Sequence, residues 1–188
     1  MRFELKLIKI IIQSILVLGI VGFGIQTYIS SLIVVHQSSM NPTLYDGDIL
    51  LTNKLTYQIS NPQVGDIVIL YKDTPSSFGS TRLGLSLEDL FSKIFNKSER
   101  TRYVKRVVAI GGDTVDIKNG SLYVNGEIVN ENYTKGFTYT NGTHFPITID
   151  EDCVYVLGDN REISLDSRNF GQVPIHRIES KVESVLPW

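Results

Sequence analysis

The stretch that decides the fold of this chain is residues 103–129, YVKRVVAIGGDTVDIKNGSLYVNGEIV. It contains runs of β-prone residues separated by Gly111-Gly112 and by two Asn-Gly pairs, at 119–120 and 125–126. Asn-Gly between such runs is the strongest short-range sequence signal for a β-hairpin. The stretch therefore predicts a meander whose strands are Tyr103–Ile110, Thr114–Lys118, Ser121–Val124 and Glu127–Val129.

Further apolar runs extend this β architecture over the rest of the domain. They are Asp48–Lys54, Asp66–Tyr71, Cys153–Leu157 and Lys181–Leu186. Residues 86–96 differ, because their apolar residues recur at helical spacing, which predicts a short amphipathic helix. This helix falls in an insertion at about 74–101, where it would pack on the domain or dip into a membrane surface. We expect residues 29–188 to form one mainly β domain.

An apolar segment precedes this domain. Neither Lys, Arg, Asp nor Glu occurs between Lys9 and Asp46. Because about 20 apolar residues in a helix cross the hydrocarbon of a bilayer, residues 10–28 are predicted to form one transmembrane helix. The basic residues before it place the tail 1–9 in the cytoplasm and the domain 29–188 on the outer face, by the positive-inside rule.

Two other interpretations of the apolar segment stay open at this point. A cleavable signal peptide would have Ile10–Val21 as its core and Gly22-Phe23-Gly24 as its cleavage site, although apolar residues continue as far as Val35. A buried helix of a soluble domain would need a charged face toward water, which the segment lacks.

Composition narrows the class of protein. Eighteen Lys and Arg against 20 Asp and Glu give a net charge of −2, so no basic surface for a nucleic acid is expected. The hydrophobic fraction of 42% fits a folded chain with at most one membrane span. The lone cysteine, Cys153, excludes an internal disulfide and a cysteine-cluster metal site, and we expect it to be buried.

Two segments suggest a nucleophile and a base. Residues 38–44, SSMNPTL, follow the predicted membrane exit closely, and Pro42 stiffens the backbone just after Ser39. In the strand after Tyr103, alternation places Lys105 on one face with Tyr103, Val107 and Ala109. Burial there would lower the lysine pKa toward that of a useful base, whereas an edge strand would let the amine reach water.

A third segment is the turn-rich loop 158–168, GDNREISLDSR, which directly follows a predicted strand. Asp166 and Arg168 can pair there, and a serine hydroxyl is available to a neighbouring group. The loop is thus either a brace for a site or a solvated turn.

In combination, these motifs are more specific than any one of them. Behind one membrane helix, the order SMNPTL (39–44), GDIV (65–68), YVKRV (103–107) and GDNREISLDSR (158–168) resembles the type I signal peptidase family, in its compact Gram-positive form. The resemblance covers nearly the whole chain. It implies a mainly β catalytic domain on a membrane anchor, with the domain outside the plasma membrane. It also implies a serine endopeptidase that cuts signal peptides from exported preproteins without a metal or cofactor.

The resemblance also implies roles for individual residues. Ser39 would be the nucleophile, Lys105 the general base, and Ser164 the hydroxyl that orients the lysine amine. The backbone N–H of Ser39 would bind the oxyanion, with Gln37 as a candidate second donor. The implied braces of the site are Asp159, Asp166 and Arg168, and the implied substrate-contacting residues are Val35, Met40, Pro42 and Val104.

Rival interpretations concern relatives and class. Self-cleaving repressors resemble the serine and lysine segments, but the membrane helix and the loop 158–168 argue against them. Reticulum-type signal peptidases carry histidine at the position of Lys105, whereas mitochondrial relatives use lysine and stay open. The alternative from another functional class is a membrane-anchored assembly partner of the same family, either non-catalytic or dedicated to a single substrate. The presence of both Ser39 and Lys105 argues against it.

Overall fold

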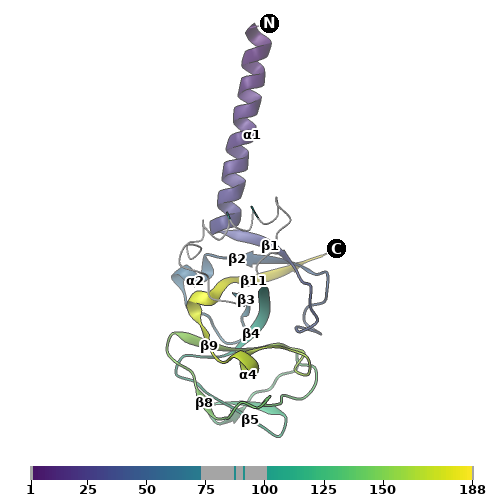
Figure 1. Cartoon of the computed structure of the whole chain (residues 1–188), viewed down its shortest axis with the longest axis vertical. Coiled ribbons are helices and arrows are strands. Elements are labelled where there is room, and N and C mark those ends of the chain that lie inside the picture. The colour runs from purple at the N-terminus through teal and green to yellow at the C-terminus, as the bar shows by residue number, and fades with distance from the viewer. Residues whose placement is uncertain (1, 73–86, 88–90, 92–100, 188) are drawn as a thin grey trace.

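The computed structural model describes residues 2–72, 87, 91 and 101–187. One long helix, α1 (Arg2–Tyr28), projects from a β domain (Figure 1). Its part Lys6–Tyr28 is long and apolar enough to cross a membrane, by length and composition. The apolar side chains of this part, such as Ile15 and Leu18, are mostly exposed. α1 is therefore not the buried core helix of a soluble domain, and the predicted span 10–28 lies within it.

The predicted insertion at 74–101 falls almost wholly outside the described residues, as does its amphipathic helix 86–96. That prediction therefore stays untested.

The domain contains two antiparallel sheets within the described residues. The larger has the strand order β1 (Ser30–Val34), β2 (Ile49–Asn53), β11 (Ile178–Leu186), β3 (Ile67–Tyr71), β4 (Arg102–Ile110), β9 (Cys153–Leu157) and β10 (Val173–Pro174). The smaller has the order β7 (Glu127–Ile128), β6 (Ser121–Val124), β5 (Thr114–Lys118) and β8 (Ile147–Thr148). Figure 1 shows β5 and β8 at the end of the molecule farthest from α1.

Only the second part of the meander predicted from residues 103–129 forms: β5, β6 and β7 pair in order, whereas β4 pairs with β3 and β9 and not with β5. β4 belongs to the larger sheet, and β5, β6 and β7 belong to the smaller one. Both Asn-Gly pairs adopt positive φ at each residue, with φ of 51° and 80° at Asn119 and Gly120. These left-handed turns are the geometry that a tight hairpin requires, which explains why Asn-Gly marks them.

Several short elements had no readable pattern in the sequence. They are β1, β8, β10, the helices α2 (Thr56–Ile59) and α4 (Ser167–Phe170), and a 3₁₀ turn at Ile175–Arg177. Apart from β1, which has five residues and continues the apolar stretch that follows α1, these elements are two-residue strands and single-turn helices. They are too short to show a periodicity, so tertiary contacts decide them. β11 also begins at Ile178, earlier than the predicted Lys181.

The alternation expected along β4 holds only in part. Tyr103 and Val107 pack together against β9, β10 and β11, as expected for residues on one face. Ala109 instead joins Val108 in the core between the two sheets. The expectation that Ala109 shares the face of Lys105 is wrong, because the pairing with β9 shifts register between Val107 and Ala109.

The core between the sheets is apolar and contains Cys153, which is buried as expected. The members of this core are Val108, Ala109, Val115, Ile117, Leu122, Ile149, Cys153, Tyr155 and Leu157. Their strands, β4, β5, β6 and β9, are thereby fixed to one another, which gives β4 a rigid support.

Candidate active site

The tertiary structure brings Ser39 and Lys105 into direct contact. Lys105 Nζ lies 2.7 Å from Ser39 Oγ, and it donates a second hydrogen bond to the Val104 carbonyl at 2.9 Å. Ser39 lies in a turn after β1, and Lys105 lies in β4, so 66 positions separate them in the chain. The pair has the geometry that a hydroxyl nucleophile and its base require.

Lys105 is buried in the middle of the larger sheet. Its exposed fraction is 1%, and β4 lies between β3 and β9, so it is not an edge-strand lysine reaching water. Burial lowers the pKa of Lys105 from 10.5 to about 8; the charges of Asp166 and Asp159 oppose this shift, and that of Arg168 adds to it. The amine is therefore neutral in a useful fraction of molecules near neutral pH.

The turn that carries Ser39 is held by hydrogen bonds to its own backbone and to the loop 158–168. Asn41 N donates to the Ser38 carbonyl at 3.2 Å. Asn160 N donates to the Ser39 carbonyl at 3.0 Å, and Asn160 Nδ2 donates to the Ser38 carbonyl at 3.2 Å. Among the described residues, no acceptor pairs with the backbone N–H of Ser39. That N–H is available to a developing oxyanion.

Asp166 and Arg168 form the predicted ion pair, fully buried in the loop. Arg168 Nε lies 2.8 Å from Asp166 Oδ1, and its Nη2 also donates to the Arg161 carbonyl at 2.8 Å. Asp166 caps α4 and accepts a hydrogen bond from Gly158 N at 3.0 Å. The loop is thus a folded brace and not a solvated turn.

The fully buried Asp159 forms a second ion pair, with the half-buried Arg106. Arg106 Nε and Nη2 reach the two carboxylate oxygens at 2.8 and 2.6 Å, and Thr43 Oγ1 donates to the same carboxylate at 2.5 Å. Arg106 also stacks over the Tyr133 ring at 4.1 Å. This network joins β4, the nucleophile turn and the loop. Sequence reasoning missed Arg106 and Thr43, although an arginine inside an apolar strand beside Lys105 was a readable signal.

Arg161 is a buried cation to which sequence reasoning gave no role. It reaches both carboxylate oxygens of Glu131, at 2.8 and 2.5 Å, and donates to Thr138 Oγ1 at 2.6 Å. Its Nε donates to the Gly158 carbonyl at 3.0 Å. Because the partner residues lie far away in sequence, no local pattern could identify them.

Ser164 is buried beside the nucleophile turn. Its hydroxyl and the Ser39 carbonyl both lie against Gly158, so closely that a Cβ there would meet both. The hydroxyl has no hydrogen-bond partner among the described residues. A buried hydroxyl without a partner is costly, which favours a role in the working enzyme.

Replacing Ser164 by alanine should therefore reduce activity without reducing stability. We expect kcat/KM to fall about tenfold if the hydroxyl orients the lysine amine. The melting temperature should stay level or rise, because an unpaired buried polar group is removed. Peptide cleavage across pH and thermal unfolding measure the two effects.

Ser180→Ala is the matched control, since its hydroxyl is also buried without a partner among the described residues, in β11. Ser180→Ala should show the same level or raised melting temperature and should keep full cleavage activity. Unchanged cleavage by Ser164→Ala would contradict an orienting role.

The predicted substrate-contacting residues divide into two groups. Val35 and Met40 are buried in one apolar cluster, against which Val104 packs. Pro42 is exposed and lies outside this cluster, and Gln37 is exposed as well. The structure therefore brings three of these side chains together next to Ser39. Among the described residues, no group of three or more His, Cys, Asp or Glu side chains could hold a metal ion.

Comparisons with known proteins identify the family of this chain. The family model described as signal peptidase, peptidase S26, matches residues 7–188. A signal peptidase I P of Bacillus subtilis subsp. natto is 31% identical over 166 residues, which is 84% of this chain and 77% of the relative. A signal peptidase I of Bacillus caldolyticus is 34% identical over 175 residues, covering 85% and 80%.

A solved structure, a signal peptidase I from Enterococcus faecalis, is 26% identical and has a TM-score of 0.40, covering 66% of this chain and 98% of that one. The family model spans nearly the entire chain, including the segments that carry Ser39, Lys105 and the loop 158–168. The chain therefore belongs to the signal peptidase family of serine peptidases.

Proposed function

We propose that this signal peptidase cuts N-terminal signal peptides from exported preproteins with Ser39 as nucleophile and Lys105 as general base. The observation that carries the proposal is the 2.7 Å contact between the Ser39 hydroxyl and a lysine amine that is almost fully buried. Burial keeps a useful fraction of the amine neutral, and a neutral amine has the lone pair that a base needs.

The proposed reaction has two halves. In the first, Ser39 Oγ attacks the peptide carbonyl carbon as its proton moves to Lys105 Nζ, and the Ser39 N–H binds the oxyanion. The lysine then gives that proton to the leaving amine as the peptide bond breaks. In the second half, Lys105 takes a proton from a water as the water oxygen attacks the ester carbonyl carbon. Lys105 then returns that proton to Ser39 Oγ as the ester bond breaks and the cleaved chain leaves with a new carboxyl end.

The buried ion pairs support this mechanism by holding the reacting groups. The Asp159–Arg106 pair ties β4 to the loop 158–168, and the Thr43 hydroxyl joins the nucleophile turn to the same carboxylate. The Asp166–Arg168 pair shapes the loop that contacts the Ser39 carbonyl. In this role Asp159, Asp166 and Arg168 are positioning residues, and Ser164, whose hydroxyl lies against Gly158 beside the Ser39 carbonyl, would orient the amine. Val35, Met40 and Val104 would line the region that receives the substrate's small side chains.

We also propose the location that the sequence indicates. α1 would anchor the protein in the plasma membrane, with residues 1–9 in the cytoplasm and the β domain outside. The basic residues Lys6 and Lys9 precede the apolar part of the helix, which supports this orientation. Preproteins leaving the cell would meet the site on that outer face.

The direct test is cleavage of a purified preprotein by the full chain in detergent. We expect one cut after a small-x-small sequence, located by mass spectrometry, and at least about a thousandfold loss in Ser39→Ala. Ser38→Ala is the matched control, because the Ser38 side chain is exposed, and it should cut at the normal rate. Equal cutting by Ser39→Ala and the unmodified protein would contradict the proposed nucleophile.

The pH dependence of cleavage should follow the protonation of Lys105. The protonated amine cannot accept the Ser39 proton, so activity should be low below pH 7 and rise through an apparent pKa near 8. Initial rates of peptide cleavage from pH 6 to 10 measure this profile. A profile that is flat over this range would remove Lys105 from the role of base.

A further inference from the structure

The membrane helix enters the catalytic sheet without a flexible linker. α1 ends at Tyr28 and β1 begins at Ser30, so a single residue, Ile29, separates them. Lys54 N donates to the Ile29 carbonyl at 2.8 Å, which continues the β1–β2 ladder up to the helix end. Thr27 is 1% exposed, unlike most residues of α1. The end of the helix is therefore packed into the domain.

The side chain of Lys54 binds the end of the helix a second time. Its Nζ donates to the Gln26 carbonyl, in the last turn of α1, at 2.9 Å. The same Nζ lies 3.4 Å from Glu179 Oε1 in β11. Glu179 Oε2 in turn lies 2.6 Å from Arg102 Nε in β4. The side chains of Lys54 and Glu179 are only 10% and 7% exposed.

Two electrostatic effects favour this position of the Lys54 ammonium. The last carbonyls of a helix lack intrahelical partners, and a cation near them is favoured by the helix dipole. Buried charges are costly unless they are paired, so the ammonium of Lys54 stays where both the Gln26 carbonyl and Glu179 can reach it. The contacts form a chain from α1 through Lys54 and Glu179 to Arg102, three residues before Lys105 in β4.

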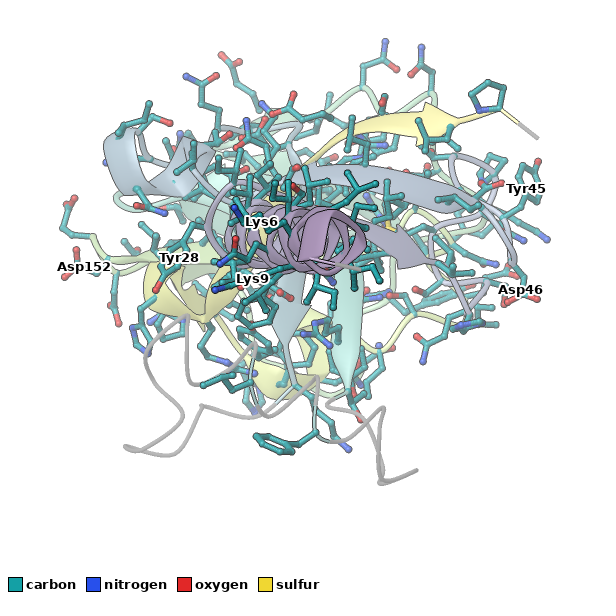
Figure 2. All side chains as sticks on the ribbon, turned by 90° about the horizontal axis from the view of Figure 1, so that it is seen from above. Lys6, Lys9, Tyr28, Tyr45, Asp46 and Asp152 are labelled. Carbon is teal, nitrogen blue, oxygen red and sulfur yellow. The ribbon has the colours of Figure 1, made fainter. Side chains whose placement is uncertain are left out.

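We infer that Lys54 is a positioning residue that locks the membrane helix to the catalytic sheet and thereby sets which bond is cut in a membrane-embedded signal peptide. The inference rests on the proposed function. If the substrate is a signal peptide in the same bilayer, the height of Ser39 above that bilayer decides which peptide bond it reaches. A loose joint would let the site tilt relative to α1. Figure 2, viewed along α1, shows the helix end-on with the domain spread around it, and Lys6 and Lys9 near its axis.

Two variants loosen the joint in different ways. Lys54→Met removes the charge but keeps a long apolar side chain, and it leaves Glu179 paired with Arg102. Insertion of two glycines between Tyr28 and Ile29 interrupts the joint without replacing any side chain. Lys118→Met is the control, since this exposed lysine pairs with Asp116 in the smaller sheet, away from α1.

Each variant is assayed on two substrates. One is a preprotein whose signal peptide is embedded in liposomes together with the enzyme, and the other is a soluble peptide that spans the same cleavage sequence without the apolar segment. Both loosened variants should cut the soluble peptide within about twofold of the unmodified rate. They should cut the embedded preprotein about tenfold more slowly, with cuts spread over neighbouring bonds in mass spectra. Lys118→Met should match the unmodified protein on both substrates.

Other outcomes overturn the inference. Equal losses on both substrates would mean that Lys54 supports the fold and not the position of the anchor. An unchanged rate and a single cut site on the embedded preprotein would mean that the joint does not select the bond. If the unmodified protein cuts neither substrate, the proposed function fails and this inference fails with it.

Discussion

Lys105→Met should lower kcat/KM for a preprotein by at least about 10³, the upper part of the range for losing a general base. Methionine has a similar length and no basic nitrogen, so Ser39 would keep its position without a proton acceptor at 2.7 Å. Lys105→Arg should be equally inactive, because a guanidinium stays protonated at every accessible pH. Single-turnover cleavage of a preprotein measures the loss.

Lys105→Met should also make the folded protein more stable at neutral pH. The pKa of Lys105 is about 8 in the folded protein and 10.5 in its ordinary state, which corresponds to a cost on the order of 3 kcal/mol for burying the charged amine. Below pH 8 the amine is protonated in both states and the full cost applies. Between pH 8 and 10.5 the unfolded chain binds more protons than the folded one, so the stability of the unmodified protein rises with pH.

Thermal unfolding in detergent, followed by circular dichroism, separates these effects. At pH 7 the melting temperature of Lys105→Met should exceed that of the unmodified protein, and the difference should shrink as the pH approaches 10.5. Lys105→Arg is the control, because it keeps a buried charge and should not gain stability. A Lys105→Met variant that melts earlier at pH 7 would show that the ammonium stabilises the fold.

Gly158→Ala should lower activity about a hundredfold, because it displaces the two serines that the loop holds. A Cβ at this position would lie 2.2 Å from Ser164 Oγ and 2.5 Å from the Ser39 carbonyl oxygen. The Ser39 carbonyl belongs to the backbone, so a change of side-chain rotamer cannot relieve the clash. The expected loss comes from the steric clash of the added Cβ and not from backbone strain, since the backbone of Gly158 is outside the left-handed region.

The stability of Gly158→Ala should fall as well, by about 1 to 3 kcal/mol, as is usual for overpacking. Activity on a peptide and thermal unfolding measure both changes. Gly22→Ala is the control, since a Cβ on Gly22 in α1 meets nothing within 4 Å and should change neither property. Normal cleavage by Gly158→Ala would show that the loop moves freely relative to Ser39.

Much of the fold was readable from local pattern. The apolar segment predicted the membrane-length part of α1, and the Asn-Gly pairs predicted the hairpins of β5, β6 and β7. Alternation in β4 predicted the buried face of Lys105, but it could not show the bulge at Val107–Ala109, because a bulge depends on the partner strand β9. The short elements between the main strands were missed for the same reason.

The candidate site divides in a similar way. The sequence proposed Ser39, Lys105, Asp159, Asp166 and Arg168 for the site, through residue type and through the resemblance in motif order. The pairing of Asp166 with Arg168 is local enough to be foreseen. Arg106, Thr43, Arg161 and Glu131 were not assigned, since their partners lie far away in the chain. Whether a lysine in an apolar strand is a base or a surface group depends on what covers the strand, and only the folded sheets answer that.

The sequence alone determined the architecture of the chain, one membrane-length helix and a β domain, and its resemblance to the family proposed the residues that would do the chemistry. The architecture follows from periodicity and turn chemistry, which are local, and the proposed residues follow from the family's motifs. Only the tertiary structure decided that Ser39 and Lys105 meet, that burial lowers the lysine pKa, and that Lys54 joins α1 to the sheet. These depend on distance and desolvation between segments far apart in sequence, and both quantities exist only once the chain is folded.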